Sequence, residues 1–207
     1  MKTVTKEMQN SISPSMALDL LKEGNKRFVN NLKINRNLLQ QANETSDGQH
    51  PFAVILSCID SRTSAELIFD QGLGDIFSVR IAGNIVNEDI LGSMEFGCKV
   101  AGAKIIVVLG HTKCGAVKGA CDNVTLGNLT GLIAKIKPAV DQEMTIKEMR
   151  NSSNAAFVES VAELNVALSV KTILLKSAII SEMVKNDDIT IVGGVHDIST
   201  GEVKFFE

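Results

Sequence analysis

Two short segments carry the side chains of this sequence that could do chemistry. Cys58 begins the segment Cys-Ile-Asp-Ser-Arg, which also contains Asp60 and Arg62, and His111 stands three positions before Cys114. Two thiolates and one imidazole form a ligand set typical of Zn²⁺, and three protein ligands leave the fourth tetrahedral position open, as in catalytic sites. The sequence therefore predicts one catalytic zinc ion per chain, bound by Cys58, His111 and Cys114.

The surroundings of these ligands also favour a catalytic site over a structural one. Cys121 would lie about 10 Å beyond Cys114 along a helix axis, which is too far for an easy fourth ligand. Two thiolates neutralise the zinc charge and make it a milder Lewis acid than a three-histidine site. Arg62 can hold the Asp60 carboxylate ionised through a bidentate pair. Gly115 follows Cys114 at the start of a predicted helix, where a thiolate and an incoming anion are both stabilised.

Short apolar runs precede both segments and predict buried strands. Such runs suit strands covered on both faces, as in a parallel sheet. Because ligands bind at the carboxyl ends of strands in open α/β sheets, neighbouring strands could bring the two segments together. The runs that predict strands cover residues 52–57, 76–81, 104–109 and 189–192, and residues 203–206 predict an edge strand after a turn.

Helical patterns alternate with these strands. Ser13 can cap the first helix, and Pro14 suits its first position. Further patterns cover about 64–70, 87–101, 114–121 and 128–138, and a long one covers 154–185 with a break near Ser177. The alternation predicts a single α/β domain over residues 1–207, with a mainly parallel β-sheet flanked by helices. Within it we expect a helical arm over about residues 1–48 and an α/β core over residues 49–207.

The composition argues against several classes of partner. A chain of 207 residues with a formal net charge of −3 and no basic run gives no reason to expect nucleic acid or an anionic membrane. No apolar stretch reaches the ~18–20 residues of a membrane span, and the N-terminus lacks the apolar region of a secretory signal. We therefore expect a cytoplasmic protein whose four cysteines serve a metal or catalysis rather than disulfides.

The joint pattern resembles the β-class carbonic anhydrases of bacterial type. Cys-x-Asp-Ser-Arg at residues 58–62, followed by His-x-x-Cys-Gly at residues 111–115, is similar to that family's signature. The resemblance covers nearly the whole chain. The other segments that carry it are Ser13-Pro14, Gly24-Asn25, Arg27-Phe28, residues 74–77, Arg80, and residues 82–84, 93–96, 107–117, 163–166 and 200–203.

The resemblance implies a zinc enzyme that interconverts carbon dioxide and bicarbonate, with zinc-bound hydroxide as the nucleophile. Cys58, His111 and Cys114 would be the zinc ligands, and Asp60 with Arg62 the catalytic dyad. In a closed state the aspartate would leave the arginine and become a fourth ligand.

The resemblance also implies an assembly. Family members are dimers or assemblies of dimers whose N-terminal helices embrace the partner, so we expect a homodimer or a dimer of dimers. The family's regulatory bicarbonate site uses a tryptophan and a tyrosine. Because this chain contains neither residue type, that site cannot be carried over to it.

Other functions stay open at the level of the sequence. A hydrolase of carbon disulfide or carbonyl sulfide would share the fold and metal site and differ in the tunnel that leads to zinc. A non-catalytic zinc-binding regulatory module would have a closed site and would tolerate replacement of Asp60 or Arg62, which would then form a structural ion pair. A thiol redox protein is disfavoured because the chain has no Cys-x-x-Cys motif.

The remaining cysteines and histidines have simpler expected roles. Cys98 and Cys121 are expected to be core or near-surface thiols. His50 and His196 could shuttle protons because of the ordinary pKa of histidine, but we expect a surface or capping role for each.

Overall fold

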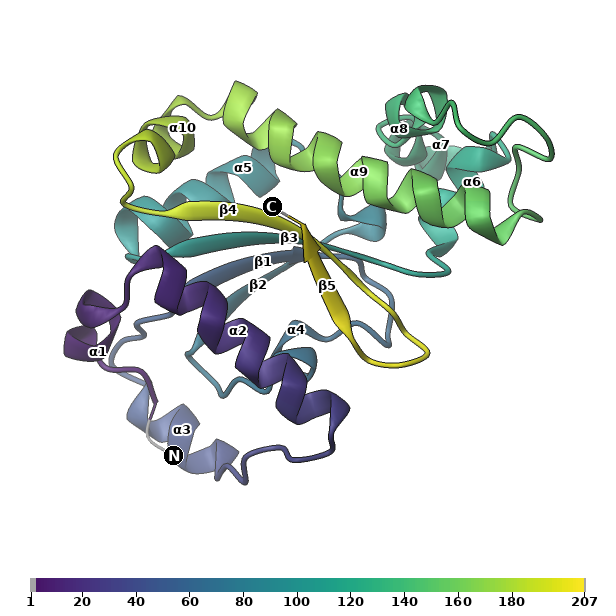
Figure 1. Cartoon of the computed structure of the whole chain (residues 1–207). Helices are drawn as coiled ribbons and strands as arrows, with labels where there is room; N and C mark the ends of the chain where they lie inside the picture. Colours follow the sequence, from purple (N-terminus) through teal and green to yellow (C-terminus); the bar gives the residue numbers. More distant parts are fainter. Residues whose placement is uncertain (1–2, 207) are drawn as a thin grey trace.

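A five-stranded sheet forms the centre of the computed structural model, which describes residues 3–206 (Figure 1). The strand order is β2-β1-β3-β4-β5. β1 (Ala53–Ser57), β2 (Ile76–Arg80), β3 (Ile105–His111) and β4 (Thr190–His196) are parallel, and the edge strand β5 (Val203–Phe206) runs antiparallel to β4. Every residue of β1 and β3 is buried, which explains their continuous apolar sequences. The predicted α/β fold with a mainly parallel sheet is confirmed.

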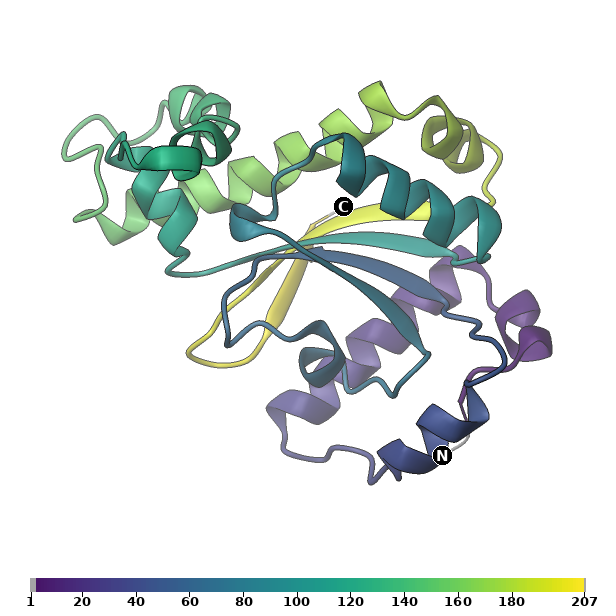
Figure 2. The same ribbon diagram turned by 180° about the vertical axis from the view of Figure 1, so that it is seen from behind.

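The N-terminal helices lie on one face of the sheet, where Figures 1 and 2 show α2 and α4 beneath the strands. Ser13 caps α2 as predicted, because its Oγ accepts a hydrogen bond from the Met16 N–H at 3.2 Å. Ala17 and Leu21 of α2 are fully buried in the same cluster as Ile55 of β1. The helices on this side are α1 (Lys6–Ser11), α2 (Pro14–Val29), α3 (Leu38–Glu44) and α4 (Ala65–Ile68).

The arm therefore covers the sheet of its own chain with α2, and its expected packing on a dimer partner stays a prediction. Neither α1 nor α3 was predicted, because each is short and its apolar residues show no helical period over two turns. The helix expected over 64–70 is shortened to the four residues of α4.

The opposite face is covered by α5 (Glu88–Glu95), which continues as the π-helical segment η2 (Phe96–Val100), by α9 (Ala155–Lys176) and by α10 (Ala178–Lys185). The predicted break near Ser177 is confirmed. The Ser177 Oγ accepts a hydrogen bond from the Ile180 N–H at 3.1 Å and so begins α10. α9 and α10 meet at an angle of 97°.

Three short helices gather at one end of α9, as both views of the ribbon show (Figures 1 and 2). They are α6 (Gly115–Cys121), α7 (Gly127–Ile133) and α8 (Lys137–Gln142). The single helix expected over 128–138 is wrong, because the chain breaks between α7 and α8. Pro138 lies in the first turn of α8, and because it has no N–H to donate to the carbonyl oxygen four residues earlier, α7 cannot continue through it.

No single helix within residues 3–206 is both long and apolar enough to cross a membrane. α9 and α10 pass that test of length and composition only when they are taken together across their bend.

Candidate active site

The two segments that carry the candidate ligands, residues 58–62 and 111–115, meet at the carboxyl ends of β1 and β3. Cys58 directly follows β1, His111 is the last residue of β3, and Cys114 caps the N-terminus of α6. Because β1 and β3 are adjacent and parallel, both segments leave the sheet at the same edge. The ligand atoms of Cys58, His111 and Cys114 all lie within 4.8 Å of one another, and the two sulfurs are 4.0 Å apart. The fold thus assembles the three residues that the sequence singled out.

The imidazole of His111 is held as a metal ligand would be. Its Nδ1 lies 2.9 Å from the carbonyl oxygen of Thr112, which leaves Nε2 as the nitrogen with a free lone pair. His111 is 1% exposed, and its Nε2 has no hydrogen-bond partner within residues 3–206. Since buried polar atoms are almost always paired, this orphaned nitrogen beside two sulfurs fits a zinc ion.

The sulfur of Cys58 is prepared for a metal by hydrogen bonds. The hydrogen bond with Cys114 lowers the pKa of the Cys58 thiol, and the same contact raises the pKa of the Cys114 thiol. The backbone N–H of Gly83 also donates to the Cys58 sulfur, at 3.3 Å. The pair therefore loses its first proton readily, and a bound metal would release the second.

Asp60 and Arg62 form a bidentate pair beside these ligands. Arg62 donates from Nε to the Asp60 Oδ1 at 2.9 Å and from Nη2 to the Oδ2 at 2.7 Å. The Arg62 side chain holds the pKa of the Asp60 carboxyl far below its usual range. The side chain of Asp60 is 17% exposed and that of Arg62 is 55% exposed. In this arrangement the carboxylate is ionised, engaged by the arginine and partly exposed to solvent.

Arg80 and Thr63 fix the backbone between Cys58 and Asp60. Arg80, the last residue of β2, donates to the carbonyl oxygen of Cys58 at 3.0 Å and to that of Asp60 at 2.6 Å. The Thr63 hydroxyl donates to the Asp60 carbonyl oxygen at 3.0 Å. The sequence offered Arg80 only as part of a resemblance, since its role depends on the pairing of β2 with β1.

Gly115 is the first residue of α6, directly after Cys114, as predicted. It is exposed, and a Cβ atom built on it would meet nothing within 4 Å. Its expected contact with substrate stays a prediction. Cys98 and Cys121 are buried core thiols, which agrees with the sequence analysis.

The expected surface or capping role is wrong for His196. This residue is 2% exposed, ends β4, and lies in register between His111 of β3 and Val203 of β5. Burial, followed by the charge of His111, lowers the pKa of His196 to about 4, so that the ring is neutral near pH 7. The burial arises because β5 folds back beside β4. His50 is half-buried.

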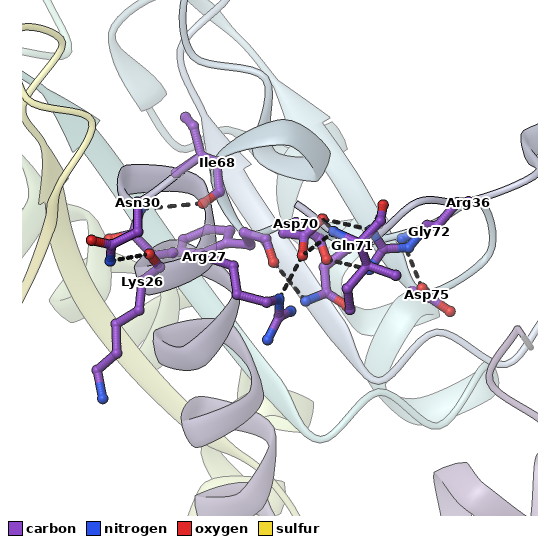
Figure 3. A network of polar contacts seen from close by, with 12 residues as sticks. Lys26, Arg27, Asn30, Arg36, Ile68, Asp70, Gln71, Gly72 and Asp75 are labelled. Carbon is purple, nitrogen blue, oxygen red and sulfur yellow. Dashed lines mark hydrogen bonds and ion pairs between the residues drawn. The ribbon is translucent and has the colours of Figure 1, made fainter. Parts of the chain in front are cut away.

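A second aspartate–arginine cluster lies outside the metal site, at the end of α4 (Figure 3). Arg27 Nε and Arg36 Nη1 each lie 2.6 Å from a carboxylate oxygen of Asp70, and the Ile34 N–H lies 3.3 Å from both oxygens. Burial acts to raise the pKa of Asp70, but the hydrogen bonds from Arg27, Arg36 and Ile34 together lower it. This cluster ties the arm to the core.

Comparisons with known proteins point to one family. The family model described as carbonic anhydrase matches residues 53–203. A carbonic anhydrase 2 of Mycobacterium tuberculosis is 35% identical over 196 residues, which cover 91% of each chain. A β-carbonic anhydrase of Aspergillus fumigatus superposes with a TM-score of 0.72 at 26% identity, over 93% of this chain and 90% of the other.

A further solved structure, one of two described as tetrameric β-carbonic anhydrases of Sordaria macrospora, superposes with a TM-score of 0.67 at 25% identity. The match covers 81% of this chain and 89% of that one. The matched range includes residues 58–62 and 111–115, which carry the candidate ligands, and the fold is shared over most of the chain. This chain belongs to the β-carbonic anhydrase family.

Proposed function

We propose that this chain catalyses the reversible hydration of carbon dioxide to bicarbonate and a proton, with one zinc ion per chain bound by Cys58, His111 and Cys114. The observation that carries the proposal is the buried group of two sulfurs and one imidazole nitrogen within 4.8 Å of one another. The orphaned Nε2 of His111 supports it, because nothing else within residues 3–206 satisfies that atom.

Bound zinc supplies a Lewis acid that makes water a nucleophile near neutral pH. The residues of the chain set the strength of this Lewis acid and the access of water to it. Two thiolates cancel the formal charge of the ion, and the neutral imidazole adds none. Three protein ligands leave one coordination position open. Activity is therefore expected to rise towards alkaline pH, since a neutral centre is a milder Lewis acid than a cationic one.

Asp60 and Arg62 are proposed as the catalytic dyad. With its pKa held low by Arg62, the Asp60 carboxylate accepts hydrogen bonds and does not donate them. It can therefore orient a donor group at the open position of the centre. The exposed side chain of Arg62 leaves the pair free to separate, as the proposed closed state with Asp60 as a fourth ligand requires. The open space at Gly115 leaves room for bicarbonate beside Cys114.

We further propose a homodimer or a dimer of dimers. The tetrameric relatives from Sordaria macrospora support an assembly of this kind. β2 and β5 are the two edge strands of the sheet, and each can extend it into another chain. The free cysteines suit the reducing cytoplasm, which we propose as the compartment.

Stopped-flow measurement of carbon dioxide hydration over pH 6.5–9, on protein of known zinc content, tests the function. One zinc per chain with fast turnover that rises with pH is the expected result. Zinc-loaded protein without turnover on carbon dioxide, but with hydrolysis of carbon disulfide or carbonyl sulfide, would replace this function by the sulfur-gas reaction. Protein that binds no zinc would overturn the proposal altogether.

A further inference from the structure

The turn at η1 (Ala82–Asn84) touches the metal site with its backbone, and the mechanism above leaves it without a role. The Gly83 N–H donates to the sulfur of Cys58 at 3.3 Å. A hydrogen bond to a thiolate withdraws electron density from it, so the sulfur donates less charge to a bound metal. In a formally neutral centre, such a bond makes the metal a stronger Lewis acid.

This turn does not hold its shape by local preference alone. Gly83 has φ +65° and Asn84 has φ +43°; glycine adopts this left-handed region freely, whereas asparagine adopts it more readily than most residues with a Cβ but still at a cost. A Cβ on Gly83 would lie 2.6 Å from the Cδ1 of the buried Ile136 and 3.2 Å from the Cβ of Ala116, so a side chain here would be crowded as well as strained. Contacts from elsewhere in the fold must therefore fix the direction of the Gly83 N–H.

Two side chains of α9 supply these contacts. The Asn165 Nδ2 donates to the carbonyl oxygen of Gly83 at 2.9 Å, and the Ser169 Oγ donates to that of Asn84 at 3.3 Å. The two residues are four positions apart, so they lie on one face of the helix. Asn165 is 4% exposed and Ser169 is 6% exposed, so both side chains are largely shielded from water. Together they clamp two successive peptide units of the turn.

We propose that Asn165 and Ser169 are positioning residues, which hold the Gly83 N–H against the Cys58 sulfur and thereby tune the electron donation of that sulfur to the metal. Neither side chain belongs to the group of Cys58, His111 and Cys114. Their effect passes through Gly83 to one ligand atom. The inference rests on the proposed function only in that Cys58 is a metal ligand.

The test uses the full-length protein loaded with Co²⁺ in place of zinc, because cobalt gives a sulfur-to-metal charge-transfer band in the near ultraviolet. In Asn165→Ala the Gly83 N–H is released and the sulfur becomes a stronger donor, so the band moves to longer wavelength. In Ser169→Ala the band moves in the same direction by less. Ile173→Val is the matched control. Ile173 is a buried residue of α9, but it lies in a different core cluster from Cys58, so its replacement should leave the band in place.

A band that stays in place in both Asn165→Ala and Ser169→Ala would overturn the inference and leave the two side chains a structural role. If Asn165→Ala does not fold, Ser169→Ala decides alone, since it removes a single hydroxyl group. A wild-type protein without any sulfur-to-cobalt band would instead overturn the metal centre, and with it this inference. The function and the clamp can thus fail separately, because the band does not depend on turnover.

Discussion

The chain contains two aspartate–arginine groups close together in sequence, and they differ in almost every physical respect. Within residues 3–206, the Asp60 carboxylate pairs with the side chain of Arg62 alone, two positions away, and the Arg62 side chain is 55% exposed. Asp70 meets Arg27 and Arg36 from the distant arm, and its side chain is 2% exposed. Figure 3 shows the two guanidinium groups converging on the second carboxylate.

The difference separates the pair proposed to be catalytic from a structural one. An exposed ion pair contributes little to stability and can open at small cost. A buried charge that loses its partner is strongly destabilising, because nothing replaces the lost contacts. The Asp60–Arg62 pair can therefore open at small cost, whereas Asp70 holds the arm and the core in one arrangement. The low pKa that both carboxyl groups share does not by itself distinguish these roles.

Replacing Asp60, the proposed catalytic aspartate, should have the largest effect on catalysis. In Asp60→Asn the shape is kept, but the amide can donate and so no longer selects the orientation of its partner, and kcat/KM for carbon dioxide hydration should fall by about a thousandfold. Stopped-flow kinetics and metal analysis check this. Zinc content and thermal stability should stay those of the wild type, and near-normal turnover would contradict the assigned role.

The matching change at the structural aspartate should act on folding instead. Asp70→Asn leaves the buried Arg36 without its carboxylate, and the free energy of unfolding should fall by about 3 kcal/mol. Urea unfolding of zinc-loaded protein measures the loss. Activity per folded molecule should stay within about twofold of the wild type. A large loss of kcat/KM in the folded variant would remove the distinction between the two groups.

A conservative change at Arg62 should lower kcat/KM less than Asp60→Asn does. Arg62→Lys keeps the positive charge but loses the bidentate geometry, so that Asp60 stays ionised and is aimed less well. We expect kcat/KM to fall by about tenfold, with zinc content unchanged. Arg62→Ala is the reference variant, and a lysine variant no better than alanine would show that charge without geometry contributes nothing.

The smallest expected effect is a difference in the acid dependence of stability. Because the folded pKa of Asp70 lies below its ordinary value of 3.8, its contribution is fully present above that value and is lost as the pH falls through the folded pKa. Between pH 5 and pH 3, the free energy of unfolding should therefore fall more steeply in wild type than in Asp70→Asn. Urea unfolding at several pH values, with both proteins free of metal, measures the slopes. Equal slopes would show that Asp70 is not held below its ordinary pKa.

The sequence by itself determined the local features of this protein. The apolar runs predicted the strands, Ser13 with Pro14 predicted the start of α2, and Ser177 predicted the break between α9 and α10. It also singled out Cys58, His111 and Cys114, which the fold brings together as a group that could hold a metal, because their chemical types are unusual at the ends of buried strands. These features depend on backbone preferences and side-chain chemistry within a few residues.

Only the tertiary structure decided which contacts form between segments that are distant in sequence. It buried His196 by folding β5 beside β4, brought Arg80 of β2 onto the carbonyl groups around Ile59, and set Asn165 of α9 on the turn at Gly83. These contacts join segments far apart in sequence, so no local pattern encodes them. They exist because burying the two faces of the sheet fixes where each helix lies, and the polar side chains must then find their partners in that packing.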